Sequence, residues 1–190
     1  MTTSCMLLYN VTRLDTGDTI TYQAAIGGRT RAMDAIGFEQ HDHSHCIATT
    51  VASVADQCAS EGLSLTPVRR RVLEILLERH RALGAYDILD VLREEGFGSQ
   101  PPVVYRALDF LTQNGFAHRI EGLNAFIACH HPGQRHAPAF LICRVCKAVA
   151  EAPADPVRRA VTDTASRAGF AVERTVVEVE GICPNCRDAA

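Results

Sequence analysis

Apolar residues in the middle of the chain recur at helical spacing, and helix-starting and helix-stopping residues divide them into segments. Thr66-Pro67, an N-cap threonine followed by a proline at the first helical position, opens a helix that we expect to reach about Gly84. Further helices are predicted at about 86–95 and 101–115, each stopped by a glycine. Residues 47–62 also have helical composition, so the pattern predicts four helices before two short strands.

The two strand-like runs lie at about 116–120 and 125–129, with turn-forming residues 122–124 between them. Helices followed by such a hairpin are typical of a winged helix-turn-helix, in which the third predicted helix supports the fourth and the fourth reads DNA. We therefore expect residues 47–131 to form a winged-helix DNA-binding domain.

Residues 132–190 show a different alternation. Strand-like runs at 139–142 and 148–150 precede a helix that opens at Asp155-Pro156, and a valine-rich strand is predicted over 170–182. Exposed edges on so small a sheet favour pairing with a second copy of the chain. The predicted fold class is therefore α/β (α+β), a winged helix-turn-helix domain followed by a small α/β dimerisation domain.

Residues 1–46 have scattered glycines and no sustained periodicity, so we expect a poorly ordered extension. The run from His41 to Cys46 that ends it contains three histidines and a cysteine, which could bind metal. Because no scaffold is predicted there, a solvated tail is the favoured interpretation.

Two widely separated Cys-x-x-Cys pairs carry the clearest chemical signal. They are Cys143-Arg-Val-Cys146 and Cys183-Pro-Asn-Cys186, and each follows a strand-like run. Two such turns supply four sulfurs in the tetrahedral arrangement that zinc prefers. A redox pair normally occurs once, at a helix start, so we predict a structural zinc site with no open position for a substrate.

Composition limits the class of protein. The chain has 190 residues with 47% hydrophobic and 22% charged residues, which is typical of a globular protein with one or two cores. A net charge of -3 means that any nucleic-acid binding must use a local basic face. Without a secretory signal or an apolar run of the ~20 residues that span a membrane, the eight cysteines indicate a soluble cytoplasmic protein whose thiols bind metal.

A second set of candidate ligands flanks the predicted domain boundary. Two imidazoles, a thiolate and a carboxylate form a four-coordinate zinc set, and the thiolate disfavours magnesium and manganese. The set is His118, Cys129, His136 and Glu151. From the residues alone, a satisfied histidine and a buried cysteine remain the simpler interpretation.

The fourth predicted helix has a polar face that contains Tyr105 and Arg106. Arginine can donate two hydrogen bonds to a guanine, and tyrosine can reach a phosphate or a thymine methyl group. A solvated helix face explains the same pattern equally well. The nearby run Arg69-Arg70-Arg71 could contact the phosphate backbone, although glutamates beside it offset its charge.

Residues 47–190 resemble the ferric uptake regulator family, specifically its zinc uptake regulator branch. The match is carried by Leu65-Thr66-Pro67 with Arg70, Ala85-Tyr86-Asp87-Ile88-Leu89-Asp90, Pro101-Pro102-Val103-Val104-Tyr105-Arg106-Ala107-Leu108-Asp109-Phe110-Leu111, Gly115-Phe116 with His118, and both cysteine pairs. The resemblance implies a homodimeric repressor of zinc uptake genes that binds a palindromic operator in double-stranded DNA. It also implies zinc as co-repressor, with two Zn²⁺ ions per subunit.

Site roles follow from the resemblance by position. Its structural zinc ligands match Cys143, Cys146, Cys183 and Cys186. Its regulatory zinc ligands match His118, Cys129, His136 and Glu151. Its DNA-reading residues match Tyr105 and Arg106, and a pair that bridges adjacent dimers in a relative matches Asp90 and Arg93.

This sequence departs from the branch at two places. Val103 stands where the branch has a threonine, which removes one hydroxyl that could contact a phosphate. The connection between Cys129 and His136 is one residue shorter than in a relative, which leaves His130 or His131 as substitutes for His136.

Other functions stay open at this point. A sensor of iron, manganese or peroxide is the alternative within the family, and Cys129 among the ligands favours zinc over the other metals. A zinc hydrolase would need an open coordination position, which a fourth protein ligand removes, so we expect no enzymatic activity.

Overall fold

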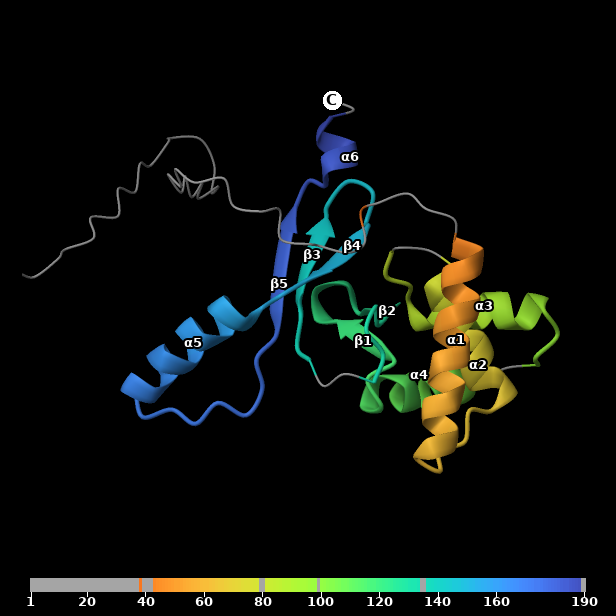
Figure 1. The fold of residues 1–190 in the computed structure, drawn as a ribbon. Helices are drawn as coiled ribbons and strands as arrows, with labels where there is room; N and C mark the ends of the chain where they lie inside the picture. The colour runs from red at the N-terminus through yellow and green to blue at the C-terminus, as the bar shows by residue number, and fades with distance from the viewer. Residues whose placement is uncertain (1–37, 39–42, 79–80, 99, 134–135, 189–190) are drawn as a thin grey trace, which may run out of the picture. The chain divides into compact units, whose positions relative to one another are not determined.

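The structure, a computed structural model, describes residue 38 and residues 43–188 apart from 79–80, 99 and 134–135 (Figure 1). These residues all belong to one compact unit of the chain. The predicted boundary between the winged-helix and dimerisation domains, after residue 131, stays a prediction.

Most of the predicted extension 1–46 lies outside the described residues. The first helix, α1 (His43–Ser60), begins four residues before position 47, where we expected it to start. The side chains of the histidine-rich run at 41–46 are not among those described.

Three further helices complete the first half of the fold. They are α2 (Pro67–Leu77), α3 (Ala85–Glu94) and α4 (Pro101–Gln113). Thr66 caps α2 by accepting a hydrogen bond from the Arg69 amide at 3.4 Å, as its N-cap position predicts. The apolar stripes of all four helices meet in one core, in which Val54, Leu73, Leu92 and Leu108 are fully buried.

The end of α2 corrects the prediction from sequence. We expected this helix to reach Gly84, but it ends at Leu77. Leu83 instead adopts an extended conformation and exchanges two backbone hydrogen bonds with Phe126, at 2.9 and 2.8 Å. This long-range pairing is stronger than continued helix because Leu83 and Phe126 are both buried in the same core.

The predicted hairpin is present as β1 (Ala117–Ile120) and β2 (Ala125–Ala128), joined by the short 3₁₀ turn η1 (Glu121–Leu123). The two strands pair antiparallel, with Ile120 opposite Ala125. Asn124 has a φ of 46°, a left-handed conformation that asparagine tolerates and that closes the turn. We call β1, η1 and β2 the wing.

A three-stranded sheet follows, in the order β4-β3-β5 (Figure 1). Its strands are β3 (Ala139–Cys143), β4 (Val149–Ala152) and β5 (Val177–Gly181), with β4 antiparallel and β5 parallel to β3. The connection from β4 to β5 contains α5 (Asp155–Arg167), and α6 (Pro184–Arg187) is the last helix of the described chain.

One face of this sheet packs against the wing. Phe140, Ile142 and Val149 form a buried cluster with Ile120 and Ile127 of the wing. The strand predicted over 170–182 is shorter than expected, because only residues 177–181 pair with β3. Helix α5 buries none of its side chains, and Val157 and Val161 remain exposed on it.

Within the described residues, no helix is both long and apolar enough to cross a membrane.

Candidate metal centres and nucleic-acid interface

The four cysteines of the two Cys-x-x-Cys pairs come together although the pairs are far apart in sequence. Cys143 ends β3 and Cys183 immediately precedes α6, while Cys146 and Cys186 lie three residues after them. All four Sγ atoms lie within 4.8 Å of one another. We call this set the cysteine cluster.

The strands and the turns after them bring these sulfurs together. Cys143 is in register with Gly181 across the parallel β3–β5 ladder, so both strands deliver their cysteine pairs to the same end of the sheet. Lys147, with a φ of 61°, turns the chain back toward β4. The sulfurs of Cys146 and Cys183 are 3.7 Å apart, and both residues are free thiols.

The protonation of the cysteine cluster indicates what it can bind. Backbone N–H groups of Cys146 and Cys183 lower the pKa of Cys143 to about 6. The neighbouring thiols, Cys183 first, raise the pKa of Cys186 to about 12. One thiolate therefore forms readily, but further ones repel it unless a cation lies among them. A divalent ion with tetrahedral sulfur coordination, such as Zn²⁺, fits this donor set.

A second cluster joins the wing to the sheet. His118 lies on β1, Cys129 follows β2 directly, Glu151 lies on β4, and His136 lies in the connection between wing and sheet. One ligand atom from each lies within 4.8 Å of the others. We call this set the mixed cluster.

Glu151 lies at the centre of the mixed cluster. Its Oε1 is 3.4 Å from Nε2 of His118, and its Oε2 is 3.6 Å from Nε2 of His136. The Cys129 sulfur is 3.5 Å from the same nitrogen of His136. Among the described residues, Glu151 is the only charged side chain that is buried, with 5% exposure. A carboxylate buried in this way requires compensating positive charge.

The electrostatics of the mixed cluster also fit a bound cation. Burial lowers the pKa of His118, which keeps its imidazole neutral. Burial, and then the charge of Glu151, raise the pKa of Cys129 to about 12. Burial opposes ionisation of Glu151, yet hydrogen bonding to His130 and the nearby imidazoles hold its pKa below the usual value.

One buried nitrogen supports a metal directly. Nε2 of His118 is buried without a hydrogen bond of acceptable geometry. Buried polar atoms in proteins are nearly always satisfied, so this nitrogen suits a metal ligand better than a core histidine. Two imidazoles, a thiol and a carboxylate are the borderline-soft set that zinc binds.

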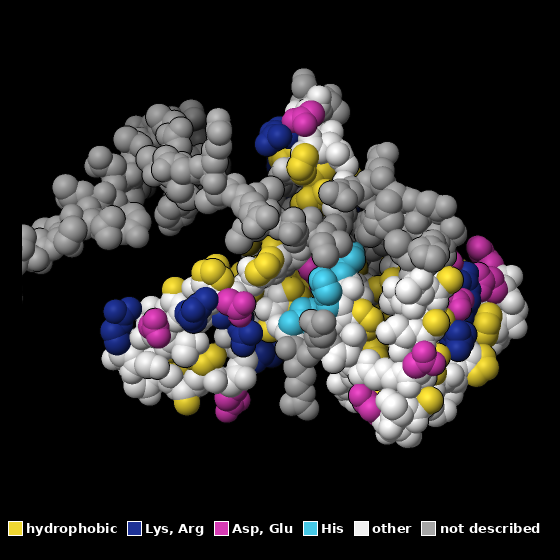
Figure 2. All heavy atoms as spheres, viewed as in Figure 1, with side chains coloured by type: hydrophobic (Ala, Val, Ile, Leu, Met, Phe, Trp, Pro, Cys, Tyr) yellow, Lys and Arg dark blue, Asp and Glu magenta, His cyan; other side chains and the backbone are white. Residues whose placement is uncertain are grey.

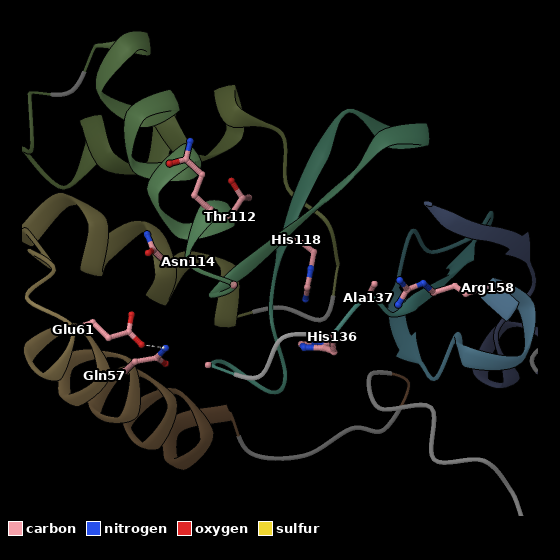
Figure 3. A pocket seen from close by; sticks show the side chains of 11 residues that line it. Gln57, Glu61, Thr112, Asn114, His118, His136, Ala137 and Arg158 are labelled. Atoms are coloured by element: carbon pink, nitrogen blue, oxygen red, sulfur yellow. Dashed lines mark hydrogen bonds between the residues drawn. The ribbon is translucent and has the colours of Figure 1, made fainter. Parts of the chain in front are cut away.

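The mixed cluster adjoins a pocket of about 580 Å³ that His118 and His136 help to line (Figure 3). Cys129 and Glu151, by contrast, are buried. Histidine side chains also gather in one patch on the face that Figure 2 shows. The two imidazoles therefore form the side of the cluster that borders this pocket.

The two predicted substitutes for His136 both lie near it. His136 is the histidine that groups geometrically with the other three ligands. His130 also lies beside the cluster, with Nδ1 3.6 Å from Oε1 of Glu151. The ring of His131 lies edge-on to the ring of His136, with ring centroids 6.1 Å apart.

Helix α4 presents the predicted DNA-reading side chains to solvent. Tyr105 and Arg106 are exposed, and the opposite face of the helix buries Val104, Ala107 and Leu108. Val103, which replaces a threonine of the branch, is also on the exposed side, at 36% exposure. That Tyr105 and Arg106 read DNA stays a prediction.

The three arginines at the start of α2 differ in their contacts within the subunit. Arg71 binds Glu95 with two hydrogen bonds of 2.7 and 2.6 Å, and it forms ion pairs with Glu74 and Glu78. Arg69 stacks over the ring of Phe110 at 3.8 Å. Arg70 is exposed, and its contact with the phosphate backbone stays a prediction.

The pair predicted to bridge adjacent dimers is exposed on α3. Asp90 and Arg93 form an ion pair of 3.6 Å within the subunit, with side-chain exposures of 69% and 49%. Its contribution to contacts between dimers stays a prediction.

Sequence reasoning passed over one residue that touches the wing. Glu178 of β5 accepts hydrogen bonds from two backbone amides of η1, although 56 and 57 residues separate the partners. No motif or spacing marks this glutamate, because the contact depends on how the wing packs against the sheet.

An exposed helix at the reading position of a winged helix, combined with two clusters of metal-binding side chains, defines a DNA-binding protein with metal centres. The chain belongs to the ferric uptake regulator family, which matches residues 60–180.

Relatives and solved structures agree with this assignment. The zinc uptake regulation protein of Escherichia coli (strain K12) is 42% identical over 130 residues, covering 68% of this chain and 76% of that protein. A structure of a zinc uptake regulator complexed with zinc and DNA superposes with a TM-score of 0.72 at 38% identity, covering 75% of this chain and 96% of that one. The crystal structure of holo XcZur gives 0.68 at 40% identity, with coverage of 74% and 98%.

Proposed function

We propose that the protein is a zinc-responsive transcriptional repressor that acts in the cytoplasm on zinc uptake genes, with zinc as its co-repressor. The observation that carries this proposal is the mixed cluster, whose ligands come from both the wing and the sheet. The similarity of the chain to zinc uptake regulators, including one bound to zinc and DNA, supports the same function.

Two zinc ions per subunit fit the two clusters. The cysteine cluster would hold a structural ion through Cys143, Cys146, Cys183 and Cys186. The mixed cluster would hold a regulatory ion through His118, Cys129, His136 and Glu151. When bound, Zn²⁺ supplies positive charge that stabilises the thiolates and the buried carboxylate.

The positions of the ligands indicate that the regulatory ion would control how the DNA-binding half is held against the sheet. Cys129 directly follows β2, and Glu151 lies on β4, so these ligands join the DNA-binding half to the sheet. In a dimer, fixing this junction fixes the separation of two recognition helices, which must match major grooves about 34–36 Å apart on a palindromic operator. Affinity for DNA and affinity for zinc then increase together, because linkage is reciprocal.

The DNA contacts would come from α4 and α2. Arg106 and Tyr105 would read base edges and backbone in the major groove, while Arg70 would bind a phosphate without reading sequence. The sheet and α5 would form the homodimer, because Val157, Val161 and Val179 leave apolar surface uncovered in the subunit.

The nearest alternative is a family member that senses iron, manganese or peroxide. The mixed cluster contains the buried thiol of Cys129, which suits zinc better than the harder ions. A hydrolase is also disfavoured, because four protein ligands within 4.8 Å leave no protein-free position for a substrate.

The test is operator binding as a function of free zinc for wild type and Cys129→Ser, with metal content measured on the same samples. We expect Cys129→Ser to retain the metal of the cysteine cluster and to lose zinc-dependent DNA binding. Cys58→Ser is the matched control, because Cys58 is equally buried, in α1, but belongs to neither cluster. A Cys129→Ser protein that responds to zinc at wild-type concentrations would show that the mixed cluster is not the sensor.

A further inference from the structure

The carboxylate of Glu178 holds the turn of the wing from the sheet side. Its two oxygens accept hydrogen bonds from the backbone N–H groups of Glu121 and Gly122, at 2.6 and 2.8 Å. Arg174, four residues earlier in the chain, forms an ion pair of 2.7 Å with the side chain of Glu121. Glu178 on β5 and Arg174 just before it therefore bind both the backbone and a side chain of η1.

Around Gly122, the Glu178 carboxylate is the one neighbour that an added side chain would meet. A Cβ atom added to Gly122 would lie 2.9 Å from the nearer oxygen of Glu178. Glycine at position 122 thus allows the carboxylate to approach the turn closely. The ion pair with Arg174 also lowers the pKa of Glu121, so this second contact keeps its charge at neutral pH.

Glu178 and the candidate zinc ligand Glu151 occupy one row of the sheet. Phe140 of β3 is in register with Glu151 on one side and with Glu178 on the other. Residues in register on neighbouring strands project from the same face. The ring of Phe140 contacts the ring of His118, with centroids 5.4 Å apart. This row therefore faces the wing, with a carboxylate at each end.

We propose that Glu178 is a positioning residue that docks the wing on the sheet without metal and thereby sets the zinc concentration at which the protein binds DNA. This inference rests on the proposed function of the mixed cluster. Glu151 and its partners hold the base of β1 and the end of β2, and Glu178 holds the turn between these strands. The two contacts favour the same docked arrangement.

The energetic consequence follows from linkage. A protein that binds its ligand only in the docked arrangement shows an apparent affinity reduced by the docked fraction. Glu178 raises that fraction before zinc binds, so less zinc is needed. Once zinc saturates the mixed cluster, the docked fraction approaches one with or without Glu178. The residue should therefore change the zinc midpoint and leave the affinity at saturating zinc unchanged.

The test variant is Glu178→Gln, which keeps the shape of the side chain but places an NH₂ group against one of the two amide donors. Glu180→Gln is the matched control, because it removes the same charge from the same strand. Glu180 is exposed, and its side chain makes no hydrogen bond or ion pair within the described part of the chain. Gly122→Ala disturbs the contact from the wing side and should behave like Glu178→Gln.

Three measurements are made on each full-length protein: operator affinity across free zinc, metal content, and hydrogen exchange of the Glu121 and Gly122 amides. For Glu178→Gln we expect a zinc midpoint about tenfold higher, the scale expected for losing charge-assisted hydrogen bonds. The affinity at saturating zinc and the metal content should match wild type, and both amides should exchange faster. Glu180→Gln should match wild type in all three.

Other outcomes distinguish a failure of the Glu178 proposal from a failure of the proposed zinc-responsive function. An unchanged zinc midpoint in both Glu178→Gln and Gly122→Ala would overturn the proposal, and so would an equal loss of operator affinity at every zinc concentration. If wild type itself does not respond to zinc, the proposed function fails and the zinc role of Glu178 fails with it. Amide exchange still shows in that case whether Glu178 docks the wing.

Discussion

Replacing Cys143 with serine should release the last part of the chain from the rest of the subunit. Among described residues after 152, only Ala154 and Cys183 are buried, and α5 buries no side chain. This segment therefore gains little from apolar burial, the main favourable term in folding. Within the subunit, it is held chiefly by the β3–β5 ladder, the contacts with the wing turn and the cysteine cluster.

The magnitudes show which of these attachments dominates. The ladder pairs five residues of β5 with β3. Each hydrogen bond contributes about 1 kcal/mol net, which does not offset about 1–2 kcal/mol of backbone entropy per ordered residue. Structural zinc sites contribute about 10–16 kcal/mol of apparent binding free energy. Whole domains are stable by only about 5–15 kcal/mol, so losing this site should unfold the segment rather than loosen it.

The assay combines metal analysis, the oligomeric state in solution and hydrogen exchange across β5. Cys143→Ser should lose one zinc per subunit, become monomeric and lose amide protection over residues 177–181. The four-helix core should keep its protection, because its buried side chains lie in a separate cluster. Cys58→Ser again serves as the control. A Cys143→Ser protein that stays dimeric with full metal content would refute the structural assignment of the cysteine cluster.

Two further predictions concern DNA reading and pH. Arg106→Ala should cost about 1–3 kcal/mol of binding free energy on the cognate operator and relax discrimination at one base. Arg70→Ala, by contrast, should weaken binding to all sequences alike and reduce its salt dependence. If Arg106→Ala binds the operator with wild-type affinity, α4 is not the helix that reads DNA. Zinc response should weaken as pH falls, because burial raises the pKa of Cys129 to about 12 and zinc must displace that proton throughout the neutral range. One released proton lowers apparent zinc affinity about tenfold per pH unit. The fall should steepen once pH drops below the ordinary histidine range near ~6.5 and His118, whose pKa burial lowers, takes up a proton. Zinc titrations of operator binding at several pH values measure this slope, and a flat profile would contradict a thiol ligand.

Local signals predicted most of the helices. Thr66 and Pro67 define the start of α2, and Pro101 defines the start of α4, because a cap and a proline act on their own turn of backbone. The end of α2 was predicted wrongly for the opposite reason. Leu83 leaves the helical pattern to pair with Phe126, more than forty residues later, and no neighbouring residue encodes that choice.

The valine-rich stretch before the last cysteine pair shows the same limit. Its composition predicts a strand over 170–182, but a strand needs a partner, and β3 offers one only to residues 177–181. Likewise, the helix predicted from Asp155-Pro156 forms as α5, but its Val157 and Val161 stay exposed because no described part of the subunit covers them.

The sequence by itself determined the cysteine cluster as two local turns, since two residues between cysteines suffice to direct both sulfurs at one ion. The mixed cluster could be identified from sequence only as one choice among several histidines, cysteines and glutamates. Tertiary structure decided which of them meet, because His118, Cys129 and Glu151 lie on three different segments whose approach depends on the wing packing against the sheet. The contact of Glu178 with the wing could not be predicted from the sequence, because its partners are backbone amides, which every residue except proline possesses.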